Sequence, residues 1–127
     1  MAAKETILII DDDDAVRRGF VRLLKGAGFD TLEARDGSEA IHVFAAHSQS
    51  ITAVTLDLEM PTTNGRETLA MLSEYAAKLP IVVATAYPVP DNLLGRQPGE
   101  PGVGYLQKPF TAAELTAELR RVIDEMK

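Results

Sequence analysis

Short, continuously apolar runs recur along the chain at intervals that suit buried strands. Four of them occupy residues 7–10, 53–56, 81–84 and 103–106, and the last is the weakest. Runs of this length and β-branched content are typical of strands that are buried on both faces of a sheet. The mixed pattern of residues 31–34 predicts a fifth strand, at an edge of the same sheet.

Between these runs the apolar residues recur with helical spacing. A stripe of Val16, Phe20, Leu23, Leu24 and Ala27 predicts a first helix that ends near Gly26 and Gly28. Three more stripes follow, at residues 40–44, 69–76 and 115–126. Each of the three is preceded by a pair with the spacing of a capping box, namely Asp36 and Glu39, Asn64 and Glu67, and Thr111 and Glu114.

Strands that alternate with helices imply right-handed crossovers and a parallel sheet covered on both faces. Five strands in a chain of this length predict an α/β protein with a flavodoxin-like (βα)5 fold, a doubly wound sheet of strand order 2-1-3-4-5. Ligands bind beyond the carboxyl ends of such strands. The functional residues are therefore expected directly after strands one, three, four and five.

One segment departs from this alternation. Residues 87–104 contain four prolines and four glycines, in the place where a fourth helix belongs. Only residues 91–97 suit a helix there, of about two turns. We expect a short or frayed fourth helix within a mobile loop.

Composition narrows the class of protein. A chain of 127 residues forms one domain, and its lack of cysteine is compatible with a reducing cytosol. It has no signal peptide pattern and no apolar stretch long enough to span a membrane. The net charge of −6 argues against a nucleic-acid-binding surface. The two adjacent basic pairs, Arg17–Arg18 and Arg120–Arg121, are interpreted as solvated helix faces.

Acidic residues follow two strands that are neighbours in the predicted sheet. Asp11, Asp12, Asp13 and Asp14 follow the first strand, and Asp57 follows the third. Asp11, Asp12 and Asp57 should converge, where three carboxylates require a raised pKa or a cation. Oxygen ligands without His or Cys favour Mg²⁺ or Mn²⁺. The simpler interpretation, a cap on the first helix, is preferred for Asp14 but not for Asp11 and Asp12.

A hydroxyl and a cation are predicted at the same edge of the sheet. Strand four ends at Thr85, and strand five is followed by Lys108 and Pro109. A lysine beside a metal ion is what a phosphoryl group requires, because its equatorial oxygens carry the charge during transfer. The Lys108–Pro109 bond also favours a cis peptide.

These residues form motifs of a known family. Ile-Ile-Asp11-Asp12, Leu-Asp57-Leu-Glu-Met-Pro-x-x-Asn-Gly, Ala-Thr85-Ala and Lys108-Pro-Phe resemble the response-regulator receiver domain of two-component signalling, as in chemotaxis regulators. The resemblance runs from about Ile7 to Asp124. It implies that residues 1–127 form a single receiver domain, a cytoplasmic switch that catalyses only its own phosphorylation and dephosphorylation.

The resemblance also implies a role for individual residues. Asp57 matches the phospho-acceptor, and Asp11, Asp12, Asp57 and the main-chain carbonyl of Glu59 would hold Mg²⁺. Lys108 would bind a phosphoryl oxygen, and Thr85 would hydrogen-bond another. Thr85 and Tyr105 match the switch positions, although Tyr105 is equally well interpreted as a strand residue packed on the sheet. Glu59 and Tyr87 match positions that modulate hydrolysis of the aspartyl phosphate.

The family further implies partners for this chain. The phosphoryl donor would be a sensor histidine kinase or a histidine phosphotransfer protein, with an unknown downstream protein and no role for nucleic acid or membrane. The altered fourth helix puts the family's common dimer in doubt. Together with residues 104–111, it resembles receivers attached to hybrid sensor kinases.

Other functional classes explain the motifs less well. A haloacid-dehalogenase-type phosphatase shares the Asp11-x-Asp13 pattern, but its later acidic pair would be Asp124 and Glu125, at the far end of the last helix. A flavodoxin would need a phosphate loop where four aspartates stand, and no P-loop motif is present. A pseudo-receiver that binds partners without phosphorylation is the third alternative.

Overall fold

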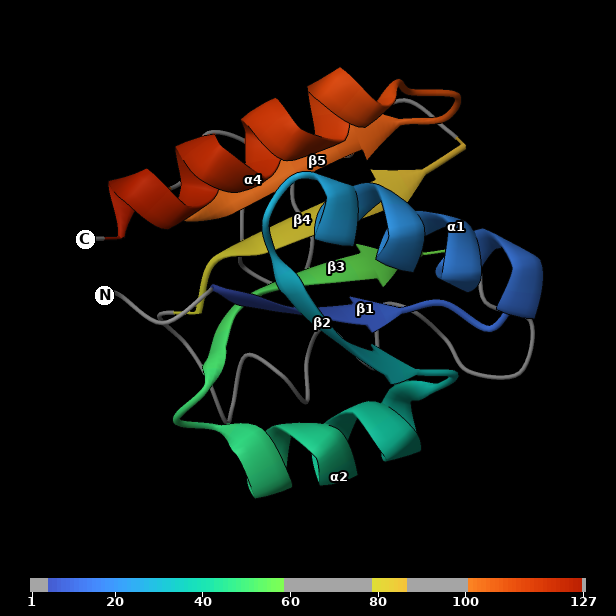
Figure 1. The fold of residues 1–127 in the computed structure, drawn as a ribbon, viewed down its shortest axis with the longest axis vertical. Helices are drawn as coiled ribbons and strands as arrows, with labels where there is room; N and C mark the ends of the chain where they lie inside the picture. Colours follow the sequence, from blue (N-terminus) through green and yellow to red (C-terminus); the bar gives the residue numbers. More distant parts are fainter. Residues whose placement is uncertain (1–4, 59–78, 87–100, 127) are drawn as a thin grey trace.

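The structure is a computed structural model that describes residues 5–58, 79–86 and 101–126. Its elements along the chain are β1 (Thr6–Ile10), α1 (Asp14–Gly26), β2 (Asp30–Ala34), α2 (Gly37–His47), β3 (Ile51–Asp57), β4 (Ile81–Thr85), β5 (Val103–Gln107) and α4 (Ala112–Glu125) (Figure 1). The helices expected near residues 64–76 and 91–97 lie outside the described residues.

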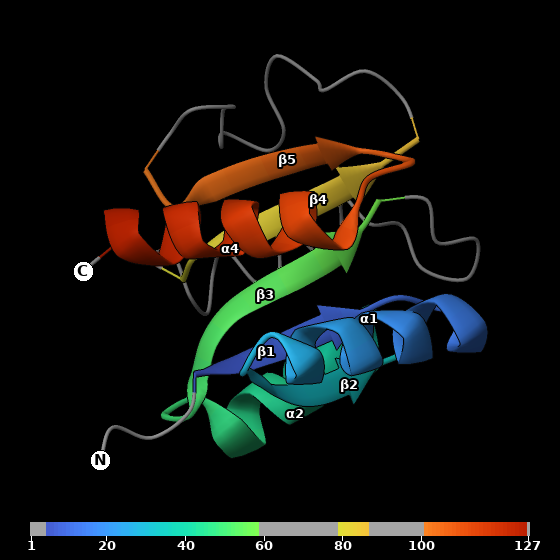
Figure 2. The same cartoon turned by 45° about the horizontal axis from the view of Figure 1, so that its top comes forward.

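The five strands form one parallel sheet in the order β2-β1-β3-β4-β5, as the alternating pattern predicts. Helices α1 and α4 lie side by side on one face of this sheet, and α2 lies on the other (Figures 1 and 2). The predicted doubly wound architecture is therefore confirmed. None of the helices in the described segments has both the length and the apolar character needed to cross a membrane.

Strand periodicity divides the core into two layers. Ile7 and Ile9 of β1 face α1 and α4, where they pack with Leu24, Phe29 and Leu119. The alternate residues of β1 and β3 face α2, in a layer that contains Leu8, Ile10, Val54, Leu56 and Ala40. Successive side chains of a strand point to opposite faces of the sheet. A central strand with apolar residues at both odd and even positions is therefore buried on both faces.

Side-chain caps define where the described helices begin. Thr111 and Glu114 form the complete capping box predicted for α4. At α2 only half of the predicted box is present, because Asp36 accepts from the Glu39 N–H, whereas Glu39 accepts from the N–H of Arg35. In a complete box the Glu39 carboxylate would accept from the N–H of the capping residue, Asp36, but here it accepts from the N–H of the residue before it, Arg35.

Polar side chains of α4 cover the open edge of β5. Glu118 accepts a hydrogen bond from the Tyr105 N–H at 3.2 Å, and Arg121 donates to the Val103 carbonyl at 3.2 Å. Exposed strand edges invite pairing with other chains, so this cover protects the sheet. The approach is close at Gly104, where a Cβ would lie 2.7 Å from Oε2 and 2.9 Å from Cγ of Glu118, so that a larger residue would displace the Glu118 side chain.

This contact predicts the effect of a small substitution. Replacing Gly104 with Ala should lower the free energy of unfolding by about 1–2 kcal/mol, because Glu118 must move and leave the Tyr105 N–H without its acceptor. Urea denaturation followed by circular dichroism measures the change.

The control is the same substitution in a Glu118→Ala background. There the clash is gone, and Gly104→Ala should be neutral or stabilise by about 0.4–1 kcal/mol, because alanine restricts the unfolded chain. An equal loss in both backgrounds would show that Glu118 is not the cause.

Candidate functional site

Three carboxylates converge at the carboxyl edge of the sheet. Asp11 follows the last residue of β1, and Asp57 ends β3, which pairs with β1 in parallel. One oxygen each of Asp11, Asp12 and Asp57 lies within 4.8 Å of the others. Asp11 is 2% exposed and Asp57 is 7% exposed. The convergence predicted from strand order is thus present in the structure.

The acidic cluster suits a divalent metal ion. Its donors are all carboxylate oxygens, the ligand type that Mg²⁺ and Mn²⁺ prefer, and their separation allows them to share one cation. A cation would also relieve the repulsion among three buried or half-buried acids. Asp11, Asp12 and Asp57 are therefore the side chains in the described segments that would hold such an ion.

The cluster perturbs the ionisation of Asp11. The pKa of its carboxyl is raised from 3.8 to about 6, chiefly by burial and also by the neighbouring charges of Asp57 and Asp12. The N–H of Asp13, which donates to Asp11 Oδ1 at 2.9 Å, and the ammonium group of Lys108 act in the opposite direction. Desolvation and like charges both disfavour the ionised form.

Lys108 supplies the cation predicted at this edge. Its Nζ lies 2.9 Å from Asp57 Oδ1, and its side chain is 32% exposed. Its main-chain N–H donates to the Thr85 carbonyl at 2.8 Å, and the Lys108–Pro109 peptide bond is cis, as predicted. The lysine therefore bonds the proposed acceptor directly from the loop that follows β5.

The two proposed switch residues lie on adjacent strands. Thr85 is the last residue of β4 and is 3% exposed. Tyr105 of β5 is half-buried and packs against the core layer on the α2 side of the sheet. Packing of this ring on the sheet was one of its two interpretations; the structure shows that packing, and a switch role stays a prediction.

Not every predicted residue belongs to the described site. Glu59 and Tyr87 lie outside the described residues. Asp13 caps α1 by accepting from the Val16 N–H at 3.0 Å. Asp14, which was predicted to cap the first helix, instead lies exposed in the first turn of α1, where it pairs with Arg17, and the capping residue is Asp13.

The orientation of α1 corrects two predictions. Val16 was placed on the buried stripe, but it is 40% exposed, and Ala27 is exposed as well. Arg17, interpreted as solvated, is instead buried, whereas its neighbour Arg18 is exposed. Arg17 stands seven residues before the buried Leu24, and this spacing is the signal that could have placed it on the inner face.

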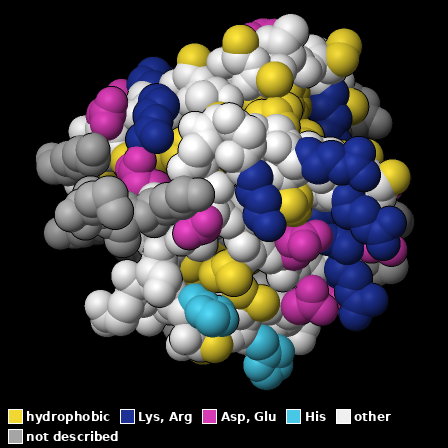
Figure 3. Space-filling view, in the orientation of Figure 1, with side chains coloured by type: hydrophobic (Ala, Val, Ile, Leu, Met, Phe, Trp, Pro, Cys, Tyr) yellow, Lys and Arg dark blue, Asp and Glu magenta, His cyan; other side chains and the backbone are white. Residues whose placement is uncertain are grey.

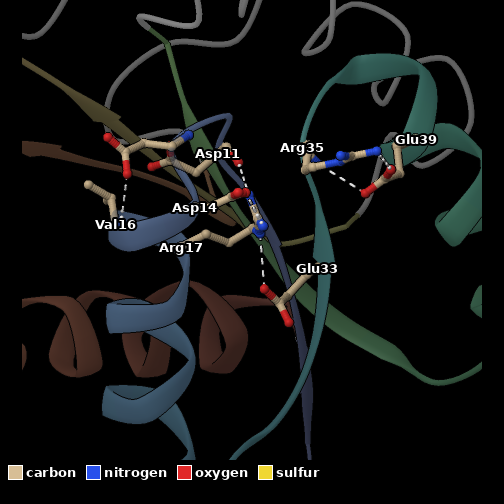
Figure 4. A network of polar contacts seen from close by, with 8 residues as sticks. Asp11, Asp14, Val16, Arg17, Glu33, Arg35 and Glu39 are labelled. Atoms are coloured by element: carbon tan, nitrogen blue, oxygen red, sulfur yellow. Dashed lines mark hydrogen bonds and ion pairs between the residues drawn. The ribbon is translucent and has the colours of Figure 1, made fainter.

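Arg17 forms a polar network with Asp14, Glu33 and the turn after β1 that contains Asp11 (Figure 4). Its guanidinium bonds Asp14 at 2.6 Å, Glu33 at 2.9 Å and the main-chain oxygen of Asp11 at 2.9 Å. Further Lys and Arg side chains gather on the side of the molecule where α1 begins, with acidic side chains among them (Figure 3). Reasoning from the sequence missed Arg17 because its partners include Glu33 on another strand and a main-chain oxygen, that of Asp11.

The phosphatase alternative fails on the position of its acidic pair. Glu125 Oε1 accepts from the N–H of Gly102 at 3.0 Å, just before β5 begins. Lys108 follows the opposite end of the same strand. The acidic residues at the end of α4 are thus a full strand length away from the cluster, as predicted.

Comparison with known proteins agrees with this geometry. The model of the response regulator receiver domain family matches residues 7–120. The response regulator MprA of Mycolicibacterium vanbaalenii is 38% identical over 118 residues, which cover 92% of this chain and 49% of MprA. The chain spans about half, or less, of the length of the curated relatives it matches.

Solved structures show the same fold. The receiver domain of the hybrid histidine kinase CckA aligns with a TM-score of 0.73 and 30% identity, over 96% of this chain and 99% of that one. The chemotaxis protein CheY4 of Vibrio cholerae aligns with a TM-score of 0.81 and 26% identity, over 94% and 99% of the two chains. On these matches, the chain belongs to the response regulator receiver domain family, the phospho-accepting domains of two-component signalling.

Proposed function

We propose that Asp57 accepts the phosphoryl group, with the help of Mg²⁺ and Lys108. The observation that carries this assignment is the position of the Asp57 carboxylate, which is 2.9 Å from an ammonium group and within 4.8 Å of two further carboxylates. Among the described residues, this is the acid where an anionic group would meet both a cation and a set of metal ligands. Residues 1–127 would act as one receiver domain.

The reaction requires little of the chain beyond placement. A carboxylate oxygen of Asp57 attacks the phosphorus of a phosphohistidine, the P–N bond breaks, and the imidazole leaves with the electron pair of that bond. The ammonium group of Lys108 stabilises the negative charge on an oxygen of the phosphoryl group during transfer. Asp11, Asp12, Asp57 and the carbonyl of Glu59 would hold Mg²⁺ or Mn²⁺, which supplies charge neutralisation when bound.

Thr85 and Tyr105 would convert this local change into a change of partner. The Thr85 hydroxyl would bond a phosphoryl oxygen only in the modified state, and the ring of Tyr105 would then shift on the sheet. Contacts that exist in one state alone move the equilibrium between two conformations. The altered surface at β4 and β5 would be the output of the domain.

The partners follow from the chemistry of the donor. A sensor histidine kinase or a histidine phosphotransfer protein in the cytoplasm would supply the phosphoryl group, and an unidentified protein would bind the modified surface. The CckA receiver domain, at 30% identity, belongs to a hybrid histidine kinase. The chain would turn over no external substrate beyond its phosphoryl donor, and it would bind no nucleic acid through this domain.

The assignment of Asp57 is tested by labelling. After incubation with Mg²⁺ and acetyl phosphate, the intact mass of the protein should rise by one phosphate, and Asp57→Asn should abolish this gain because the amide is not a nucleophile. Asp30→Asn, at an exposed acid, is the matched control and should be labelled normally. Labelling of Asp57→Asn at the normal rate would refute the assignment.

The pKa of Asp11 predicts how pH affects metal binding. Because the folded chain holds a proton on Asp11 with a pKa of about 6, Mg²⁺ affinity should fall as the pH drops below about 6. Without metal, the stability contributed by this group is fully present below pH 3.8 and is lost as the pH rises through about 6.

Isothermal titration calorimetry with Mg²⁺ on either side of this pH measures the first effect, and urea denaturation in a chelator measures the second. Asp11→Asn should bind Mg²⁺ more weakly and should lose this part of the pH dependence of stability, whereas Asp30→Asn should retain both. An Mg²⁺ affinity that does not change over the interval would contradict the role of Asp11.

Tyr87, which lies outside the described residues, is proposed to shield the phosphoryl group from water. Tyr87→Ala should therefore shorten the lifetime of the aspartyl phosphate several-fold, measured by loss of label after the donor is removed. Tyr75→Ala is a control for the removal of a tyrosine elsewhere in the chain. An unchanged lifetime in Tyr87→Ala would contradict the proposed shielding by Tyr87.

A further inference from the structure

Arg17 is a buried cation that the proposed phosphoryl chemistry does not use directly. Its side chain is only 9% exposed, although it lies in the first turns of a surface helix. Burying a guanidinium is unfavourable unless it is paired and fully hydrogen-bonded. The contacts of Arg17 therefore indicate why the chain keeps a charge in this place.

Two of these contacts neutralise the charge and fix the guanidinium plane. Nε bonds Glu33 Oε1 at 2.9 Å, and one terminal nitrogen bonds Asp14 Oδ1 at 2.6 Å. The two carboxylates come from β2 and from the start of α1, so they hold the planar fork from two sides (Figure 4). A rigid fork that is fixed at two nitrogens has its third donor direction fixed as well.

The third donor reaches the turn that carries the acidic cluster. The remaining terminal nitrogen of Arg17 donates to the main-chain oxygen of Asp11 at 2.9 Å, and this bond is buried. On its other side, the Asp11 N–H donates to the Ala34 carbonyl at 3.1 Å. The carbonyl of Asp11 belongs to the peptide that leads to Asp12, so its direction sets where both side chains begin.

Repulsion makes this support necessary. The carboxylates of Asp11, Asp12 and Asp57 lie within 4.8 Å of one another, and like charges at that distance push a free turn apart. The guanidinium does not enter the cluster as a ligand or counter-ion, because its charge is matched by Asp14 and Glu33. Its contact with the cluster is to an uncharged carbonyl, which gives position and not neutralisation.

We propose that Arg17 is a positioning residue for metal binding, which holds the peptide between Asp11 and Asp12 so that both carboxylates face Asp57. This inference rests on the proposed function of the acidic cluster as a Mg²⁺ site. It assigns to the Arg17 network the role of an outer shell, which orients the residues that bind the ion.

The test compares two adjacent arginines in the full chain. Arg17→Met removes the fork and leaves Asp14 and Glu33, which are 59% and 44% exposed, free to be hydrated. Arg18→Met removes the same charge from an exposed position on the same helix. By titration calorimetry, Arg17→Met should bind Mg²⁺ about tenfold more weakly than wild type, whereas Arg18→Met should stay within twofold.

Two further measurements separate positioning from general damage. Labelling by acetyl phosphate should approach the wild-type rate in Arg17→Met when the Mg²⁺ concentration is raised to saturation, because the substitution weakens Mg²⁺ binding and leaves the phosphoryl transfer itself unchanged. Arg17→Lys keeps the charge but lacks the fork, so it should also bind Mg²⁺ at least threefold more weakly. If Arg17→Met does not fold, Arg17→Lys decides the question.

The outcomes distinguish the two proposals. Mg²⁺ binding by wild type that is lost in Asp12→Asn, together with equal affinities for Arg17→Met and Arg18→Met, would overturn the role of Arg17 alone. Wild-type affinity in Arg17→Lys would overturn it as well, because charge would then suffice. If wild type itself binds no Mg²⁺, the proposed metal site fails first, and the positioning role fails with it.

Discussion

Repulsion among carboxylates at one edge of the sheet is the constraint on which the site depends. Asp11, Asp12 and Asp57 are brought together by the adjacency of β1 and β3, and burial raises the pKa of Asp11 to about 6. Such an arrangement persists only where cations and a rigid backbone oppose it. Lys108 provides a cation at Asp57, and Arg17 donates a hydrogen bond to the main-chain oxygen of Asp11.

The sheet makes this arrangement possible because its central strands are held on both faces. Residues of β1 and β3 pack against α1 and α4 with one parity and against α2 with the other. A backbone fixed in this way has little freedom to separate its acidic ends. The packing of the apolar core therefore opposes the repulsion among the carboxylates at the edge of the sheet. The functional residues sit where the strands end, since the strand interiors are fully used for packing.

The α1 helix links the core to the site. Leu24 anchors its C-terminal half in the core, while Arg17 in its first turns bonds β2 and the turn after β1. Phe20 extends this link, because its ring lies 5.7 Å from that of Phe110, two residues beyond Lys108. A shift of α1 would therefore displace both the turn that contains Asp11 and the loop that contains Lys108.

Local pattern was enough to predict the fold class, from which the strand order followed, and it indicated most residues of the candidate site. Apolar runs of strand length, helical stripes and capping pairs depend on neighbours in the chain, and these gave every described element to within a few residues. Asp11, Asp57, Thr85 and Lys108 were recognisable because each stands at a strand end, a position that the pattern already fixes. The family motif then assigned their roles.

The tertiary structure decided the rotation of α1 and the contacts of its first arginine. The stripe of apolar residues predicted an inner face through Val16, but that residue is exposed and Arg17 is buried. The partners of Arg17 are Glu33 on β2, Asp14 on its own helix and a main-chain oxygen, and main-chain oxygens carry no sequence signal. The sequence shows which residues are charged, but only the packed chain shows which charges can be buried together, because pairing depends on distances that are set by the packing of α1 against β2 and the turn after β1.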